Sequence, residues 1–255
     1  MERLSNSRST GGLHTGSLRA WAMLFAIAGI ISRCILQHTL LGVGNSSMQQ
    51  LFELIQADQS AMIIATVSLV LQAMETVAVP IFVFLLFEGF HHTSDWKKYL
   101  TRVAALAVLT EIPYDLAMSG KVLEFGTQNP VLGLLLCFAL LLLFRRFEGK
   151  KLICIIMALA GFVWALMLRI DHGVPMMLML CVMQLFRNKK MYMGFSGVAA
   201  AALCTGLSPF YLVAPMGFLV IHFYNGEQGN SSKLVNYLFY PVTLLVIGLL
   251  AKFAF

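Results

Sequence analysis

Long apolar segments separated by short polar loops recur along almost the entire chain of 255 residues. Most are long enough, or nearly long enough, to cross roughly 30 Å of bilayer hydrocarbon as helices. Nine such segments are expected, at positions 18–41, 61–90, 99–118, 129–144, 151–168, 173–186, 191–207, 210–224 and 234–255. The pattern therefore predicts an all-α fold, a polytopic transmembrane helical bundle of about nine spans.

The second segment leaves two interpretations open. It is apolar over 30 positions but is interrupted by Gln72, Glu75 and Pro80. It is either one long tilted helix kinked at Pro80 or an interfacial helix followed by a spanning one. Glu75 is accordingly either a deep carboxylate or the interfacial end of the spanning part.

Composition agrees with the hydropathy pattern. The chain is 59% hydrophobic and 12% charged, with a mean hydropathy of +0.80, whereas a soluble domain carries about 25% charged residues. Its formal net charge is +6, spread over short loops, so nucleic-acid binding is the weaker interpretation. Basic loops alternate with loops poor in Lys and Arg, which predicts a cytoplasmic N-terminus. Residues 1–17 are expected to be a flexible cytoplasmic tail, and residues 18–255 a single integral membrane domain.

The sequence contains none of the common nucleotide, hydrolase or metalloprotease signatures. Its five cysteines lie inside apolar segments without CxxC spacing, so we expect buried, reduced thiols rather than a disulfide or metal site. The Met-rich stretch 175–179 is expected to be packing. Two glycosylation sequons, at Asn45 and Asn230, fall on opposite sides of the predicted topology and are interpreted as unused.

The first group of candidate chemical residues ends the second segment. Glu88, His91 and His92 stand at i, i+3 and i+4, so both imidazoles can lie on the Glu88 face of a continuing helix. A carboxylate beside a histidine can orient it as a general base. The alternative is an interfacial polar cluster that ends the helix.

Basic residues follow this group at Lys97, Lys98 and Arg102. The two lysines fit a cytoplasmic loop. Arg102 lies inside the next apolar segment, where it could pair with Glu88 or meet an anionic phosphate.

The third segment ends in Glu111 and Asp115, with Pro113 between them, so the helix should bend or end there. The alternative for Asp115 is a polar helix end in water. Asn129 then fits the N-cap of the next helix, with Pro130 in its first turn.

A compact polar group lies between the fifth and sixth segments, at Arg169, Asp171, His172 and Gly173. The plain interpretation is a solvated loop with an internal Arg–Asp pair. His38, near the end of the first segment with Arg33 five residues before it, is interpreted as an interfacial side chain.

The order of these residues resembles the TraX family of bacterial membrane proteins, named for acetylating a conjugative pilin. The resemblance covers about residues 18–190, is most specific over 80–93 and 111–115, and is weaker from Asp171 to Asn188. The family usually shows an Asp-His pair in the first segment, where this chain has Gly29 and Ile30. It often has a basic residue just before Pro80, where this chain has Glu75 and Thr76.

The resemblance implies a membrane acetyltransferase in the bacterial inner membrane, with acetyl-CoA as donor and no metal. The acceptor would be an amine or hydroxyl of a pilin-like peptide or a surface polymer, and membrane lipid is the other expected partner. Roles are expected as catalytic for Glu88, His91, His92, Asp171 and His172, cofactor-binding for Lys97, Lys98 and Arg102, and substrate-binding for Glu111, Asp115 and Asn129. The alternatives are a small-molecule transporter and a non-catalytic pilus or surface assembly factor.

Overall fold

The computed structural model describes residues 12–42, 58–187, 189–227 and 233–253, together with Gln49, Glu53 and Gln56. The sequons at Asn45 and Asn230, Asn188, most of the loop 42–59 and the first eleven residues of the predicted tail lie outside the described residues. The last three residues of the predicted tail already belong to the first helix.

All regular structure in the described ranges is helical, and β-pairing there is limited to two isolated bridges. Each of the nine segments expected as spans contains helix. The helices are α1 (Thr15–Ile30), η1 (Ile31–Leu40), α3 (Gln59–His92), α4 (Trp96–Ser119), α5 (Pro130–Arg146), α6 (Lys151–Met167), α7 (Gly173–Leu185), α8 (Lys190–Leu203), η2 (Cys204–Gly206), η3 (Pro209–Val213), α9 (Pro215–His222) and α10 (Lys233–Phe253).

Two helical stretches in the described ranges are both long and apolar enough to cross a membrane. These are Thr15–Leu40, which combines α1 with η1, and Gln59–His92, which is α3. The remaining apolar helices found by the same criterion are shorter, at 10–17 residues.

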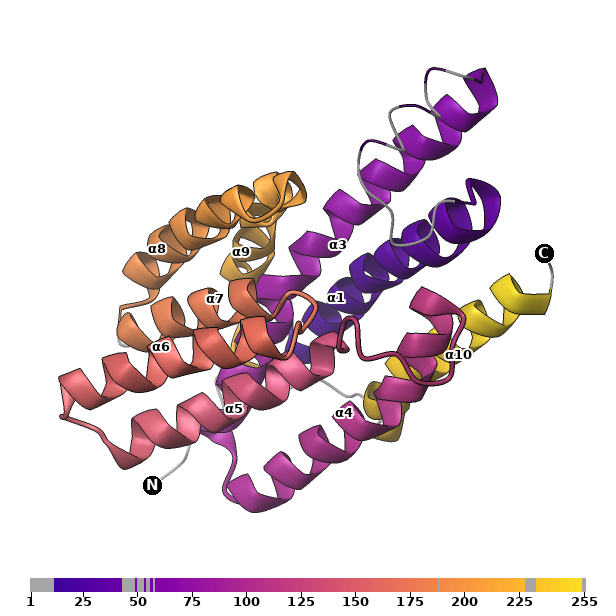
Figure 1. Cartoon of the computed structure of the whole chain (residues 1–255). Coiled ribbons are helices and arrows are strands. Elements are labelled where there is room, and N and C mark those ends of the chain that lie inside the picture. The colour runs from indigo at the N-terminus through magenta and orange to yellow at the C-terminus, as the bar shows by residue number, and fades with distance from the viewer. Residues whose placement is uncertain are drawn as a thin grey trace, which may run out of the picture.

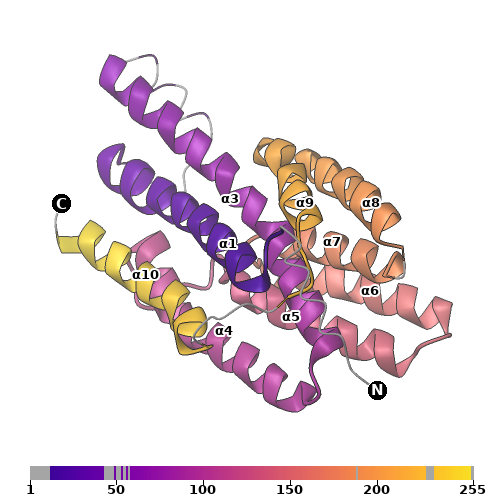
Figure 2. The ribbon, with the colours of Figure 1, turned by 180° about the vertical axis from the view of Figure 1, so that it is seen from behind.

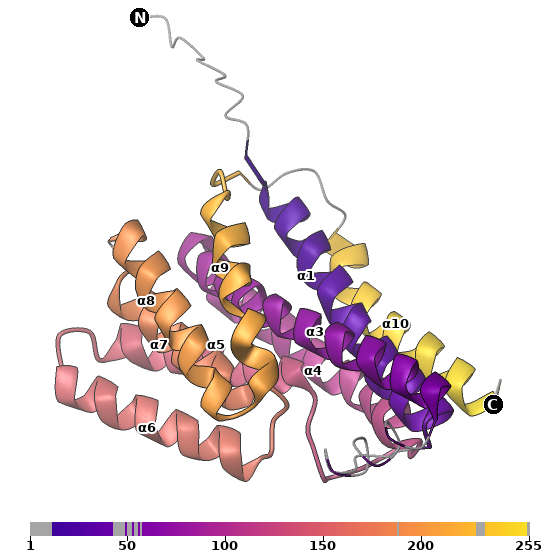
Figure 3. The ribbon, with the colours of Figure 1, turned by 90° about the horizontal axis from the view of Figure 1, so that it is seen from above.

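Helix α3 lies at the centre of the bundle. Helix α1 runs along it, and α10 lies against α4 (Figures 1 and 2). From above, α6, α7, α8 and α9 form one side of the molecule, and α1, α3, α4 and α10 form the other (Figure 3). Helix α5 contacts α3, α4, α6 and α7 and so joins the two sides.

Both internal prolines are accommodated within continuous helices. Helix α3 passes through Pro80 without a break from Gln59 to His92, which confirms the single long helix over the split one. Helix α4 passes through Pro113 and ends at Ser119, close to the expected end of the third segment, so of the predicted bend or end at Pro113 the end is excluded. Helices packed all round can tolerate proline because their neighbours supply the lost interactions.

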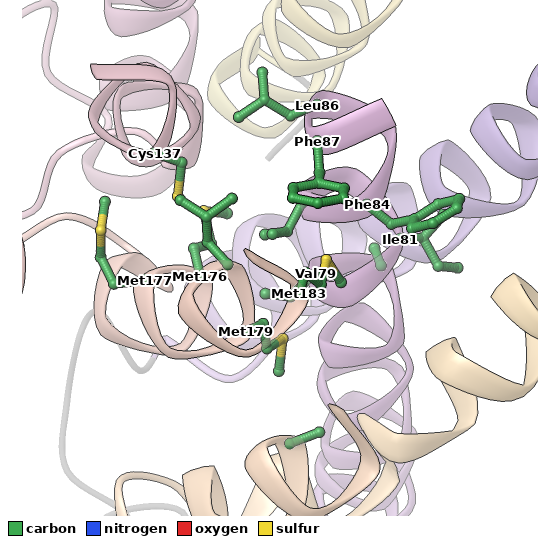
Figure 4. Close-up of a cluster of buried hydrophobic side chains, with 14 of the residues drawn as sticks. Val79, Ile81, Phe84, Leu86, Phe87, Cys137, Met176, Met177, Met179 and Met183 are labelled. Atoms are coloured by element: carbon green, nitrogen blue, oxygen red, sulfur yellow. The ribbon is translucent and has the colours of Figure 1, made fainter. Parts of the chain in front are cut away.

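The largest core cluster lies between α3, α5 and α7. Figure 4 shows Phe87 of α3 facing Cys137 of α5 and the methionines of α7, whereas Phe84 points to the other side of α3 and packs edge-on against Tyr224. Met177, Met179 and Met183 are completely buried, which confirms the Met-rich stretch as packing. The five cysteines are free thiols that are buried or half-buried, in agreement with their expected packing role.

Because successive helices reverse direction, alternate connections lie at the same end of the bundle (Figure 1). The connections α3–α4, α5–α6 and α7–α8 form what we name the basic face. Its basic residues are Lys97, Lys98, Arg145, Arg146, Lys150, Lys151, Arg187, Lys189 and Lys190. The connections α4–α5, α6–α7 and α8–η3 form the opposite face, which carries only Lys121 and Arg169 among its described basic residues.

Candidate functional site: a charged cluster between two cavities

A cluster of charged side chains lies inside the bundle, between η1, α3 and the α6–α7 connection. Arg33 Nη1 donates to Asp171 Oδ2 over 2.7 Å, and Arg33 Nη2 donates to Glu75 Oε1. Tyr114 of α4 donates its hydroxyl to the same Asp171 oxygen over 3.0 Å. The side chains of Arg33, Glu75 and Asp171 are 23%, 9% and 16% exposed, so the cluster is largely shielded from solvent.

The backbone around Arg33 is fixed to α3 by neutral polar contacts. Ser32 donates its hydroxyl to the Ser68 carbonyl over 2.7 Å, and Gln37 Nε2 donates to the Ser68 hydroxyl over 2.9 Å. Arg33 itself lies in η1, a ten-residue π-helix. Such wide turns are rare and frequently occur at functional sites. The charged side chain of Arg33 therefore lies on a rare type of helical turn.

The α6–α7 connection is a strained turn that presents Asp171 and His172. Arg169 and His172 have φ of 51° and 57°, the left-handed region that costs a side-chain-bearing residue about 1–3 kcal/mol. The Gln128 N–H donates to the Arg169 carbonyl over 3.0 Å, and the Asp171 N–H donates to the Gln128 carbonyl over 2.9 Å. These two bonds to the α4–α5 connection hold the turn in place.

His172 extends the cluster and has two different nitrogen environments. Its Nδ1 lies 2.5 Å from the Tyr211 hydroxyl. Tyr211 belongs to η3, which is attached to α3 because Thr76 donates its hydroxyl to the Phe210 carbonyl over 2.9 Å. Its Nε2 lies 3.6 Å from Glu75 and 3.7 Å from Asp171, and has no hydrogen-bond partner among the described residues although it is buried.

The charges of the cluster shift the titration of the two residues in the α6–α7 connection. Burial alone would raise the pKa of Asp171, but Arg33, His172 and two hydrogen bonds hold that pKa well below its usual range. Burial alone would lower the pKa of His172, but Asp171 and Glu75 outweigh burial and raise that pKa above its ordinary value. His172 is therefore suited to accept a proton.

Glu75, Asp171 and His172 also form the one set of potential metal ligands found among the described residues, with ligand atoms within 4.8 Å of one another. The Arg33 guanidinium already bridges the two carboxylates. A cation bound there would have to displace Arg33 or add a further positive charge beside it. The donor set therefore fits a guanidinium better than a metal, and the absence of a metal stays a prediction.

Two cavities meet at this cluster. The first has a volume of about 1040 Å³, which includes space open to solvent at its mouth, and it runs between α1, α3, α4, α5 and α10 toward the basic face. The second encloses about 1160 Å³ on the same measure, and it is lined by connections of the opposite face. Glu75 and His172 line both cavities. The cluster thus forms the wall between a space reached from one end of the bundle and a space reached from the other.

The predicted group at the end of α3 is built differently from our expectation. His92 Nδ1 lies 2.9 Å from Glu88 Oε2, but His91 turns away and packs edge-on against Phe87 and Phe90. The expectation that both imidazoles share the Glu88 face was therefore wrong. Glu88 is thirteen residues beyond Glu75 on α3, which is about 20 Å along the helix axis. The predicted catalytic residues fall into two separate groups, and neither His91 nor His92 lines a described cavity.

The predicted phosphate-binding residues lie on the surface of the basic face. Lys98 pairs with Asp95 over 3.1 Å, and the Lys97 ammonium lies 5.7 Å from the Trp96 ring centroid. Arg102 is exposed and makes no ion pair with Glu88. None of the three lines the first cavity, whose basic residue is Arg19.

The predicted substrate-binding residues instead hold the α4–α5 connection together. Asn129 caps α5 by accepting from the Leu132 N–H over 3.1 Å, as predicted, and it donates to Glu111 of α4. Asp115 is 2% exposed and accepts from the Glu124 N–H over 2.8 Å, so its interpretation as a helix end in water was wrong. Glu111, Asp115 and Asn129 line neither cavity, and their contacts are those of a structural support.

Sequence reasoning missed most of the cluster. The sequence alone leaves the depth of Glu75 open, associates Arg33 only with His38, and indicates no role for Tyr114 or Tyr211. The expected Arg169–Asp171 pair was wrong, because Asp171 pairs with Arg33 and Arg169 is exposed. The available signal was the presence of Arg33 and Glu75 inside apolar segments, where an ionised side chain is costly without a partner. His38 is exposed, in agreement with its interfacial interpretation.

Comparison with known proteins gives one match. The family model described as TraX protein matches residues 24–251, which is nearly the whole chain. No curated protein and no solved structure matches the chain.

Proposed function

Because the chain belongs to the TraX family, we propose that it is a membrane-bound acetyltransferase that moves an acetyl group from acetyl-CoA to an amine or hydroxyl acceptor. One observation carries the proposal. His172 offers a buried nitrogen without a hydrogen-bond partner at the only wall shared by the two described cavities. Such a position allows one base to reach a donor in one cavity and an acceptor in the other.

The chemistry follows from the two nitrogen atoms of His172. In the tautomer in which Nδ1 donates to Tyr211, Nε2 carries the lone pair. An acceptor N–H or O–H attacks the thioester carbonyl and gives its proton to Nε2, so that a new C–N or C–O bond forms. The C–S bond then breaks, and the leaving thiolate takes the proton from His172. Asp171 and Glu75 stabilise the imidazolium formed between these steps, as a nearby carboxylate does in other acyl-transfer sites.

Arg33 is the positioning residue in this scheme. Its guanidinium holds Glu75 and Asp171 on either side of His172 and offsets one of their two negative charges. With neutral His172 the four groups carry one net negative charge, and protonation of His172 makes them neutral. The cluster is thus arranged to favour the protonated state that the reaction needs transiently.

The same proposal places the bundle across the bacterial inner membrane with about nine spans. The basic face and the N-terminus would be cytoplasmic, following the preference of short basic loops for that side. Large apolar side chains on the outer surface of α6, including Leu152, Ile155 and Leu159, support a lipid-facing role for that helix. Acetyl-CoA would enter from the basic face. A peptide or surface-polymer acceptor would enter through the second cavity.

Thiol release from acetyl-CoA tests the function without knowledge of the natural acceptor. The purified protein in nanodiscs is given acetyl-CoA with hydroxylamine as a small nucleophile, and free CoA thiol is measured. We expect His172→Gln to lower the rate by about a hundred- to ten-thousand-fold. The wild-type rate should rise with pH through a pKa above 6.5, the ordinary histidine value, because the base must be deprotonated. This acid limb should be absent from the variant.

Exposed histidines provide the comparison in this assay. His38→Gln is the matched control, because His38 is exposed and lines neither cavity. A loss of rate in His91→Gln or His92→Gln, with His172→Gln unchanged, would move the chemistry to the end of α3 and overturn the assignment. An acetyl-CoA concentration that stays constant with the wild-type protein would remove the enzyme proposal altogether.

The transport alternative is favoured by one observation. A substrate pathway of a transporter that is closed at its middle would also consist of two cavities that meet at a charged wall. A transporter would move a small anion or cation into proteoliposomes without releasing thiol from acetyl-CoA. A non-catalytic assembly factor would do neither, and its cellular role would tolerate His172→Gln.

A further inference from the structure

We propose that Arg19, Tyr99 and Tyr237 form a phosphate-binding site at the mouth of the first cavity, for the head group of a long thioester donor. The inference rests on the proposed function and adds to it a binding site at a place that the sequence did not suggest. The ligand chemistry that fits this cavity is an anionic phosphate group followed by an apolar chain.

The first observation is the distribution of polar residues along the cavity. Glu75, His172 and Tyr240 lie at its inner end, and Arg19, Tyr99 and Tyr237 line its other end. Apolar side chains cover the walls between these ends, namely Met23, Ala26, Ala78, Val79, Phe82, Leu85, Leu86, Val103, Leu106, Val131, Leu134 and Met176. A ligand that fills this cavity is polar at its two ends and apolar in the middle.

The second observation is the distance between the two ends, which two helices give independently. Gly29 of α1 lies against the Glu75 carboxyl, and Arg19 is ten residues earlier, about 15 Å along the axis. On α3, Leu86 is eleven residues beyond Glu75, about 16 Å along that axis. The ligand must therefore be extended, with its reactive end well separated from its anionic head.

The third observation is the charge at the mouth. Arg19 makes no ion pair with any described residue, although it is half-buried in an apolar helix. The only acidic residue lining this cavity is Glu75, at the far end. Tyr99 and Tyr237 line this cavity together with Arg19. An arginine without a carboxylate partner, flanked by two phenols, is suited to bind a phosphate.

Tyr99 is held in position by its neighbours. A Cβ atom added to Gly89 would lie 2.7 Å from the Tyr99 hydroxyl, so the ring packs directly on the α3 backbone. Its other side meets Phe138 edge-on, with ring centroids 5.1 Å apart. The phenol therefore keeps a fixed position at the mouth of the cavity, as a binding site requires.

A coenzyme A thioester has this combination of features: phosphates at one end, a slender arm, and an acyl group at the tip. A phospholipid also joins a phosphate to apolar chains. With its phosphate at the mouth, however, a phospholipid would bring no reacting group to the inner end of the cavity. We therefore assign the mouth to the phosphates of the donor. The arm would run along the apolar walls and bring the acetyl carbon to His172.

Steady-state kinetics with two donors tests the assignment. Acetyl-CoA carries the phosphates, and S-acetyl-pantetheine lacks them, with thiol release as the measurement. We expect Arg19→Gln to raise the KM for acetyl-CoA about tenfold or more while kcat changes little. The KM for S-acetyl-pantetheine should stay unchanged. Arg146→Gln is the matched control, because Arg146 is an exposed arginine of the basic face that lines neither cavity.

Equal KM values for the Arg19→Gln and Arg146→Gln proteins would overturn the assignment, as would a rise in KM produced by Arg102→Gln alone. Tyr99→Phe provides a second test that keeps the ring packing and should raise the KM by a smaller factor.

If the wild-type protein consumes neither donor, the proposed function fails, and the site is then tested by binding of labelled CoA to protein in phosphatidylcholine nanodiscs. Weaker CoA binding by Arg19→Gln than by Arg146→Gln supports the site independently of catalysis. Equal binding, or displacement of CoA when phosphatidylglycerol is added, assigns the mouth to lipid and overturns it.

Discussion

At the scale of single residues, Arg33 has the largest effect on the arrangement of the site. It joins two carboxylates that come from positions far apart in the chain, and both carboxylates flank His172. Removing one partner of a buried ion pair leaves the other groups charged and unpaired, which costs more than the pair contributes. The stability of the cluster therefore depends on this one guanidinium.

We expect Arg33→Met to lower the free energy of unfolding by about 3–5 kcal/mol, because Glu75 and Asp171 would be left facing each other without a cation. Thermal unfolding of the purified protein in detergent measures the effect. Arg169→Gln is the control, since Arg169 is an exposed arginine near the same turn. Equal unfolding temperatures for the two variants would contradict the role given to Arg33.

At the scale of helices, the beginnings of the elements follow local sequence signals. Asn129 and Pro130 begin α5 as predicted, and Asp58 and Asp95 cap α3 and α4 by accepting from the backbone N–H groups of Ser60 and Lys98. These signals act within one turn of helix, so they can be read without tertiary structure. The cap at Asn129 differs from the others because the same side chain also contacts α4.

Asn129→Ala should therefore destabilise the protein more than an ordinary cap substitution. The variant loses the cap of α5 and leaves the Ala107 carbonyl and the Glu111 carboxyl without their donor. We expect a loss of about 2–3 kcal/mol in the free energy of unfolding, measured by thermal unfolding in detergent. Asn129→Asp keeps the cap acceptor but loses the amide donor, so its free energy of unfolding should lie between those of Asn129→Ala and the wild type. A value equal to that of the wild type would mean that the contact with Glu111 contributes nothing.

At the scale of the whole molecule, hydropathy predicted where helices lie along the described parts of the chain, but it did not predict the site. Every expected segment contains helix because the apolar pattern that predicts a helix is a property of each segment alone. The Arg33–Asp171 contact joins positions 138 residues apart, and its geometry depends on how η1 and the α6–α7 connection are placed in space. Sequence spacing favours the group at Glu88, His91 and His92 because its members are close in sequence. Spacing of this kind cannot reveal a pairing between residues that are far apart in the chain.

The arrangement of the two faces makes a prediction at this scale. Lys150→Cys lies on the basic face and Lys121→Cys on the opposite face, and both positions are exposed. In intact cells, a membrane-impermeant maleimide should label Lys121→Cys, whereas Lys150→Cys should react only after the cells are opened. The native cysteines give a low background because they are buried or half-buried. Labelling of both positions from the same side would refute the proposed topology.

The close approach of α1 to α3 at Gly29 has a consequence for how this protein can change over evolutionary time. A Cβ atom at position 29 would lie 2.1 Å from the Glu75 carboxyl, so no side chain fits there while Glu75 keeps its place. A lineage that acquires a side chain at position 29 must first shorten or reorient residue 75, so the order of the two substitutions is constrained.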